Sequence, residues 1–126
     1  MTLVAFVWGW DVALVTLETV AYGRSGDKGD SSNVGLVARN EAVYRWMKAA
    51  ITPAWVKGVF GAVVKGRVER FEVPRVLALN FILHDSLGGG GSASLLTDAQ
   101  GKTHAQALLR CRVDVPDDVL ATLTTV

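Results

Sequence analysis

The segment 22–33 carries the densest collection of chemically active residue types in the chain. It holds three glycines, four formal charges and a run of hydroxyl and amide side chains. Glycine lets a backbone approach a ligand closely, and Asp, Ser and Asn fix tight turns by bonding to nearby backbone groups. We predict a shaped polar loop with Asp27 and Lys28 as catalytic candidates and, as residues that bind an anionic group, Arg24, Ser25, Gly26, Gly29, Asp30, Ser31 and Asn33. The alternative is a hairpin turn whose charges only face water.

His84 is the third catalytic candidate, because histidine titrates near neutral pH and a neighbouring carboxylate such as Asp85 could orient it for proton transfer. Adjacent residues of a strand point to opposite faces, which weakens Asp85 as the orienting group. A purely structural histidine is the alternative. Asn80 interrupts the apolar run before His84, and a buried amide without partners costs about 1–3 kcal/mol. We predict that Asn80 orients the ligand or stabilises an oxyanion.

A run of four glycines follows, formed by Gly88, Gly89, Gly90 and Gly91. Consecutive backbone N–H groups in such a run can form a concave nest that binds carboxylate or phosphate. The alternative is a flexible hairpin connection. Asp27 and Asp30 lack the spacing of an EF-hand, although they could help hold Mg²⁺ through water. We predict no metal site and no cofactor.

Composition restricts the classes of function. The chain has 126 residues, which suits a single domain over residues 1–126. Its 13 basic and 12 acidic side chains nearly balance, so the chain lacks the positive electrostatic potential that attracts nucleic acid. The lone Cys111 has no internal partner and suits the cytoplasm. Residues 1–13 form an apolar extension without the features of a signal peptide or a membrane span. This extension could form an edge strand, dock on a partner, or result from a translation start placed too far upstream.

The pattern of apolar residues predicts the elements that position these candidates. Strands are expected over residues 14–22 and 33–39, on either side of the polar loop. Asn40 is a plausible N-cap for a helix with an apolar stripe, and Thr52-Pro53 ends that helix and starts a second one that runs to Gly66. Strands follow over 67–73 and 76–83, the latter buried on both faces and central in the sheet.

The last part of the chain is less distinct. A strand over 94–98 and a turn over 99–102 precede residues 103–115, whose alternation predicts one long strand, although residues 101–110 alone could form a helix. Pro116 starts a short terminal helix. Several strands around a helical hairpin predict α+β architecture, with an antiparallel sheet and helices packed on one face, as in ferredoxin-like folds.

The sequence resembles a known family in four segments that occur in the right order. They are residues 21–35, which include Arg-Ser-Gly-Asp-Lys-Gly-Asp, residues 78–84, residues 87–91 and residues 98–102. Together they resemble the small C-terminal domain of the acyclic terpene utilisation protein AtuA and its relatives, over about residues 15–116. The resemblance implies a ferredoxin-like fold and a free-standing version of a domain that usually follows a much larger one.

The resemblance also implies a pathway. Relatives act in the catabolism of acyclic terpenes and branched acids as coenzyme A thioesters, so a separately encoded large AtuA-type subunit is the expected partner. Our first hypothesis is a small subunit that completes an acyl-CoA site of the hydratase or dehydratase type. The second is a non-catalytic assembly module, and the third is a symmetric homo-oligomer. No nucleic-acid or membrane partner is expected.

Overall fold

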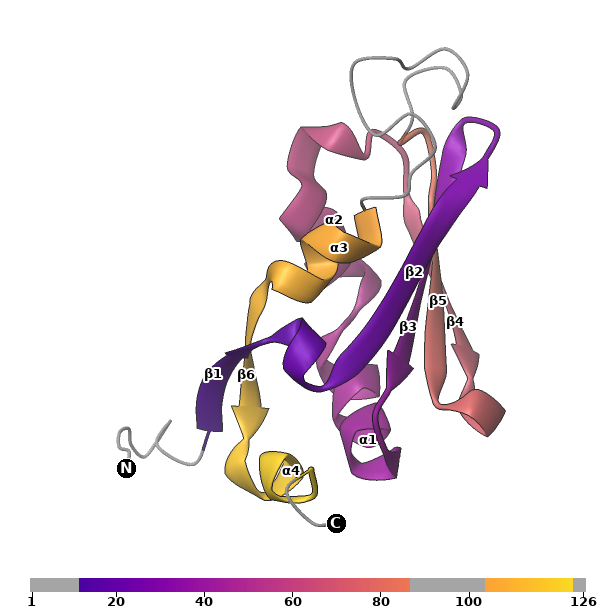
Figure 1. The fold of residues 1–126 in the computed structure, drawn as a ribbon. Coiled ribbons are helices and arrows are strands. Elements are labelled where there is room, and N and C mark those ends of the chain that lie inside the picture. Colours follow the sequence, from indigo (N-terminus) through magenta and orange to yellow (C-terminus); the bar gives the residue numbers. More distant parts are fainter. Residues whose placement is uncertain (1–11, 87–103, 124–126) are drawn as a thin grey trace.

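The computed structural model describes residues 12–86 and 104–123, and at residues 27 and 28 only the backbone (Figure 1). A four-stranded antiparallel sheet has the order β2-β3-β5-β4. Its strands are β2 (Ala21–Lys28), β3 (Ser31–Ala38), β4 (Val68–Val73) and β5 (Ala78–Leu83). A smaller sheet pairs β1 (Val12–Thr16) with β6 (Arg112–Pro116). The predicted α+β fold with antiparallel strands is therefore confirmed.

The predicted single strand over residues 14–22 is wrong, because a 3₁₀ turn, Leu17–Thr19, divides it. Leu17 is fully buried, and the backbone N–H of Val20 donates to the carbonyl of Leu17 at 3.0 Å. The chain therefore leaves the smaller sheet after β1 and enters the larger sheet at Ala21.

The predicted polar loop is also wrong in extent, because most of it belongs to strands. β2 and β3 pair from Ala21 opposite Ala38 to Lys28 opposite Ser31, which leaves a two-residue turn. Gly29 has φ of 66° at the first turn position, where a tight hairpin turn of type II′ needs glycine. Since β3 also pairs with β5, sheet pairing overrides the low strand propensity of glycine, serine and asparagine.

The two central helices begin where the sequence predicts. Before α1 (Glu41–Ala50), the side chain of Asn40 accepts from the backbone N–H of Val43 at 2.9 Å. Before α2 (Pro53–Phe60), the hydroxyl of Thr52 accepts from the N–H of Trp55 at 3.0 Å. α2 ends earlier than expected, and a 3₁₀ turn, Gly61–Val63, continues toward β4.

The predicted long strand over residues 103–115 is wrong, and the helical alternative for its first part is correct. α3 (His104–Arg110) precedes β6 and buries Ala105, Leu108 and Leu109 at helical spacing. A methyl group at Gly23 would lie 3.2 Å from Leu109, so α3 packs closely on β2. α4 (Asp117–Ala121) begins after Pro116 as predicted. The strand expected over 94–98 and the turn over 99–102 lie outside the described residues.

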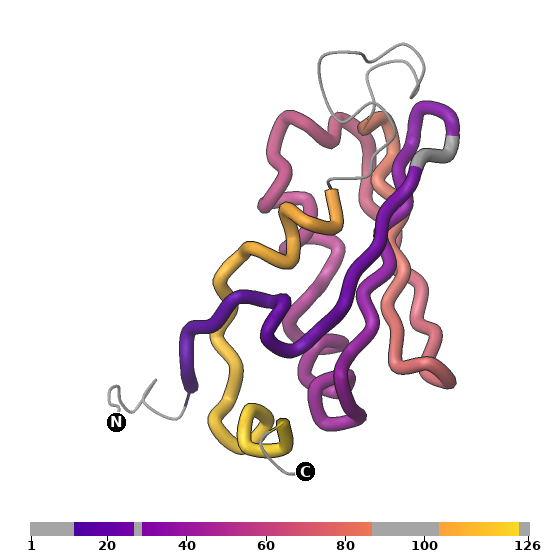
Figure 2. The backbone as a smooth tube through the Cα atoms, in the orientation of Figure 1, coloured from indigo at the N-terminus to yellow at the C-terminus, as the bar shows by residue number. Residues whose placement is uncertain are grey.

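The core lies between the four-stranded sheet and the helices. α1, α2 and α3 all lie on one side of this sheet (Figure 2). Leu36, Leu79 and Phe81 point toward them and are fully buried, whereas Asn80 and Ile82 are half-buried on the other side. β5 is central as predicted, but the prediction that both its faces are buried is wrong. We call the side opposite the helices the open face, because no described helix or strand covers it.

Candidate functional site

The hairpin β2–β3 distributes the predicted site residues over both faces of the sheet. Arg24 and Gly26 lie opposite Gly35 and Asn33 and belong to the open face. Ser25 belongs to the helical side, where its hydroxyl accepts from the backbone N–H of Ala105 at 3.2 Å. These residues therefore do not line one loop.

The tip of the hairpin holds the remaining predicted residues of this segment. Asp27 is the register partner of Ser32, and Lys28 that of Ser31. Gly29 and Asp30 form the turn, and the carbonyl of Asp30 accepts from the backbone N–H of Ser86 at 3.0 Å. The tip of the hairpin is thereby attached to the chain that follows β5, close to His84.

An amide pair lies at the centre of the open face. The Nδ2 group of Asn33 donates to Oδ1 of Asn80 across neighbouring strands. Asn80 thus has the partner that a partly buried amide requires, and its own NH₂ group keeps two donors. Arg24 lies in the same cross-strand row, because Gly35 pairs with Arg24 on one side and with Asn80 on the other.

His84 has an orienting carboxylate, but it comes from Glu69 on β4. His84 Nε2 lies 2.6 Å from Glu69 Oε1, and Arg67 Nη2 lies 3.5 Å from the same oxygen. The hydrogen bond from His84 lowers the pKa of the Glu69 carboxyl below its usual 4.5, and Arg67 adds to this effect. The suggestion that Asp85 orients His84 is therefore wrong, since Asp85 begins a turn with φ of 50°.

Sequence reasoning missed a buried network of two serines and a histidine at the same end of the sheet. Ser32 Oγ lies 2.9 Å from Ser86 Oγ and 2.8 Å from His104 Nδ1, and the Ser86 hydroxyl donates to the Leu83 carbonyl at 2.8 Å. Ser32 is fully buried, and the other two are less than 8% exposed. This network holds Ser86 and His104, the residues that flank 87–103, close to each other.

One arrangement of the hydroxyl and ring protons makes all three contacts of this network hydrogen bonds at the same time. The single hydroxyl proton of Ser86 is used by the Leu83 carbonyl, so Ser32 must donate to Ser86. Ser32 then has only lone pairs for His104, and Nδ1 of His104 must carry a proton. In this arrangement Nδ1 of His104 takes no proton from Ser32, which fits a structural role for the network.

The structure brings part of the predicted site together. The open face holds Ser31 and Asn33 on β3, Asn80 on β5 and His84 directly after β5. Arg24 and Gly26 lie on the same face of β2, which pairs with β3. Ser25 lies on the other side of the sheet. The glycine run 88–91 and the side chains of Asp27 and Lys28 lie outside the described residues, so their part in the site stays a prediction.

No pocket described by the structure encloses these residues. A hollow of about 470 Å³ lies beside β2 and α3, lined by Tyr22, Arg39, Gln106 and others, and one of about 610 Å³ lies between α1 and α4. Among the described residues, no three His, Cys, Asp or Glu side chains gather as metal ligands would. The arrangement thus offers an oriented histidine, an amide with N–H donors and a guanidinium on the open face.

Comparison with known proteins agrees with this architecture. Residues 15–114 match the family model of the AtuA ferredoxin-like domain. The chain belongs to this family. The matched range of the AtuA ferredoxin-like domain includes the whole four-stranded sheet, the amide pair and the His84–Glu69 pair. No curated protein and no solved structure matches the chain. In the described part of the domain, no helix is long and apolar enough to cross a membrane.

Proposed function

We propose that this AtuA ferredoxin-like domain is the small subunit of a larger AtuA-type protein in the catabolism of acyclic terpenes or branched acids as coenzyme A thioesters. The observation that carries the proposal is the His84 side chain, oriented by Glu69, on the same open face as the Asn33–Asn80 pair. Acid–base chemistry on a thioester requires a site that excludes water, and ligand sites are concave. A large subunit lying on the open face supplies the missing walls.

The proposed reaction is hydration or dehydration next to the thioester carbonyl. His84 donates from Nε2 to Glu69, so Nδ1 can take a proton from the water that attacks the β-carbon and then deliver it to the α-carbon, as the C–O bond forms and the C=C double bond is lost. The two free donors of Asn80 would bind the carbonyl oxygen, where negative charge develops. Arg24 would bind an anionic group that approaches the same face. Asp27, Lys28 and the glycine run 88–91 complete the proposed set.

The second candidate is a non-catalytic assembly module. It is favoured by exposed apolar side chains on the same face, among them Tyr22, Val37 and Phe71. In that case His84 and Asn80 only shape an interface. Under either candidate we propose a cytoplasmic location, where the single Cys111 needs no disulfide partner.

Reconstituted activity distinguishes the two candidates. The chain is combined with the large AtuA-type protein encoded nearest to it, and turnover of acyl-CoA thioesters is measured. His84→Ala should lower kcat by about 100-fold or more, as loss of a general acid–base does, and alanine at Asp27 or Lys28 should also reduce it. Asp114→Asn, on exposed β6, is the matched control. Unchanged activity with the His84→Ala chain bound would establish the assembly module instead.

A further inference from the structure

The open face of the sheet is a grid to which β2 and β3 contribute four residues each and β4 and β5 three each. One row across the strands is apolar and contains Tyr22, Val37, Ala78 and Val73. The next row contains Arg24, Gly35, Asn80 and Phe71, and the one after it contains Gly26, Asn33, Ile82 and Glu69. Apolar side chains therefore lie beside the polar site that is described above.

The apolar part of this grid is exposed to an unusual degree. Tyr22 is 57% exposed, Phe71 49%, Val73 40% and Val37 38%. These side chains come from three strands and adjoin each other through the pairing of the sheet. A contiguous apolar patch on a sheet face is characteristic of a surface that another molecule covers.

Packing among the described residues does not require glycine at two positions of this grid. A methyl group at Gly26 would meet nothing within 4 Å, and one at Gly35 would meet only Asn80 Oδ1 at 3.8 Å. By contrast, a methyl at Gly66 would lie 2.7 Å from the carbonyl oxygen of His84, and Gly29 has positive φ. A glycine inside a strand weakens it and often marks a place where another backbone or a ligand approaches closely. Gly58 on α2 is also not required by packing, but it stands alone on its helix.

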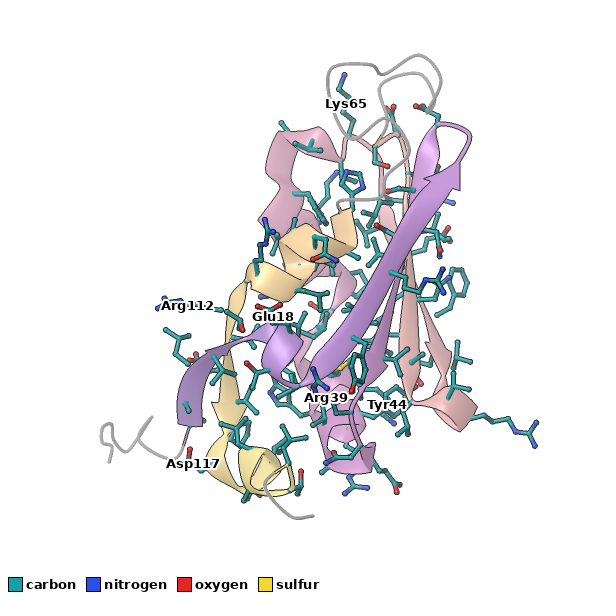
Figure 3. The ribbon with its side chains drawn as sticks, viewed as in Figure 1. Glu18, Arg39, Tyr44, Lys65, Arg112 and Asp117 are labelled. Carbon is teal, nitrogen blue, oxygen red and sulfur yellow. The ribbon has the colours of Figure 1, made fainter. Side chains whose placement is uncertain are left out.

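The charges on the open face are mostly positive. Glu69 already pairs with His84 and Arg67. Arg24 makes no ion pair within the described residues. The guanidinium of Arg39 lies 4.0 Å above the Tyr22 ring and donates to the carbonyls of Glu18 and Thr19. Figure 3 shows Arg39 at the end of the sheet where β2 begins. Two guanidinium groups thus lie beside the apolar row without carboxylate partners in this part of the chain.

We propose that the open face is the docking surface for an acidic, apolar surface of the large AtuA-type subunit, whose backbone lies against Gly26 and Gly35. This inference rests on the proposed function. Carboxylates of the partner pair with Arg24 and Arg39, and its apolar side chains cover Tyr22, Val37, Val73 and Phe71. Charge complementarity argues against a second copy, because two identical faces would bring Arg24 and Arg39 together, and Glu69, the carboxylate described on this face, already pairs with His84 and Arg67.

The test measures the Kd between this chain and the nearest-encoded large AtuA-type protein by calorimetry. Arg24→Glu and Gly35→Ala should each weaken binding by about tenfold or more, as the loss of a central contact does. Their matched controls are Arg112→Glu and Gly58→Ala. Figure 3 shows Arg112 pointing away from the four-stranded sheet, and a methyl at Gly58 also meets nothing within 4 Å. Both controls should stay within about twofold of the unmodified chain.

The possible outcomes separate this inference from the proposed function. Gly35→Ala should keep or raise the thermal midpoint, since its Cβ has room, so weaker binding would not reflect unfolding. A complex whose Kd is unchanged by Arg24→Glu and Gly35→Ala would overturn the docking surface alone. Absence of any complex with the unmodified chain would overturn both proposals. A homodimer of the isolated chain that Arg24→Glu dissociates would overturn the choice of occupant.

Discussion

Replacing Ser32 with alanine removes the central hydroxyl of the buried network. Two groups then lose their hydrogen bond to Ser32. They are the Ser86 oxygen, which accepts from Ser32, and the His104 N–H, which donates to Ser32. Each buried polar group left unsatisfied costs roughly 1–3 kcal/mol, so two groups cost roughly 2–6 kcal/mol together. Partial relaxation of the neighbouring side chains keeps the loss in the lower half of this sum. We therefore expect Ser32→Ala to lower the free energy of unfolding by about 2–4 kcal/mol.

Urea denaturation at neutral pH measures this change directly. Ser31→Ala is the matched control, because the side chain of this neighbouring serine faces the open side and its hydroxyl makes no hydrogen bond within the described residues. This variant should change the free energy of unfolding by less than about 0.5 kcal/mol. Ser86→Ala should cost less than Ser32→Ala, and the double variant should be less destabilised than the sum of both, since the two residues share a bond.

The proton order in the network has a spectroscopic signature. Ring ¹⁵N shifts of His104 should show a protonated Nδ1, because only that atom can donate to Ser32. The reasoning is refuted if Nδ1 is unprotonated, or if Ser32→Ala costs no more than Ser31→Ala.

Three further predictions concern stability. Gly66→Ala should lower the free energy of unfolding by roughly 1–3 kcal/mol in urea titrations, because the added Cβ would lie 2.7 Å from the His84 carbonyl oxygen. Gly26→Ala is the control and should not lower it, because its added Cβ would have no neighbour within 4 Å. Equal effects of the two substitutions would contradict this prediction. Tyr44→Phe should change stability by less than about 1 kcal/mol, because the buried hydroxyl approaches the Val73 backbone without forming a hydrogen bond of good geometry among the described residues, and a larger loss would contradict this. Because His84 lowers the pKa of Glu69, ionised Glu69 contributes stability above its unfolded pKa of 4.5 that is lost as the pH falls through the folded pKa. The thermal midpoints of the unmodified chain and Glu69→Gln should therefore differ at neutral pH and converge in acid, and a pH-independent gap would contradict this.

Local signals in the sequence predicted α1, α2 and α4 but not α3. Asn40 and Thr52 cap α1 and α2 as expected, because capping depends on residues only three positions apart. The segment 103–115 satisfies both periodicities, since Ala105, Ala107 and Leu109 alternate as in a strand, whereas Ala105, Leu108 and Leu109 have the spacing of a helix. Only the packing of α3 against Gly23 decides between them.

Only part of the candidate site could be predicted, because some of its residues stand out in the local sequence whereas the contacts between them depend on the pairing of distant strands. Asn80 and His84 were found as polar residues ending an apolar run. Their partners Asn33 and Glu69 depend on the register of β3 and β4 against β5, which no local pattern encodes. Ser32, Ser86 and His104 are similarly far apart in sequence, and nothing in their neighbourhoods distinguishes them from surface residues.

Co-expression of this chain with the large AtuA-type protein encoded nearest to it, followed by size exclusion of the pair and of each alone, tests the central claim most directly. The account predicts that the two proteins elute together and earlier than either alone, because the open face is completed by the larger subunit. Separate elution of the two at their individual positions would contradict it.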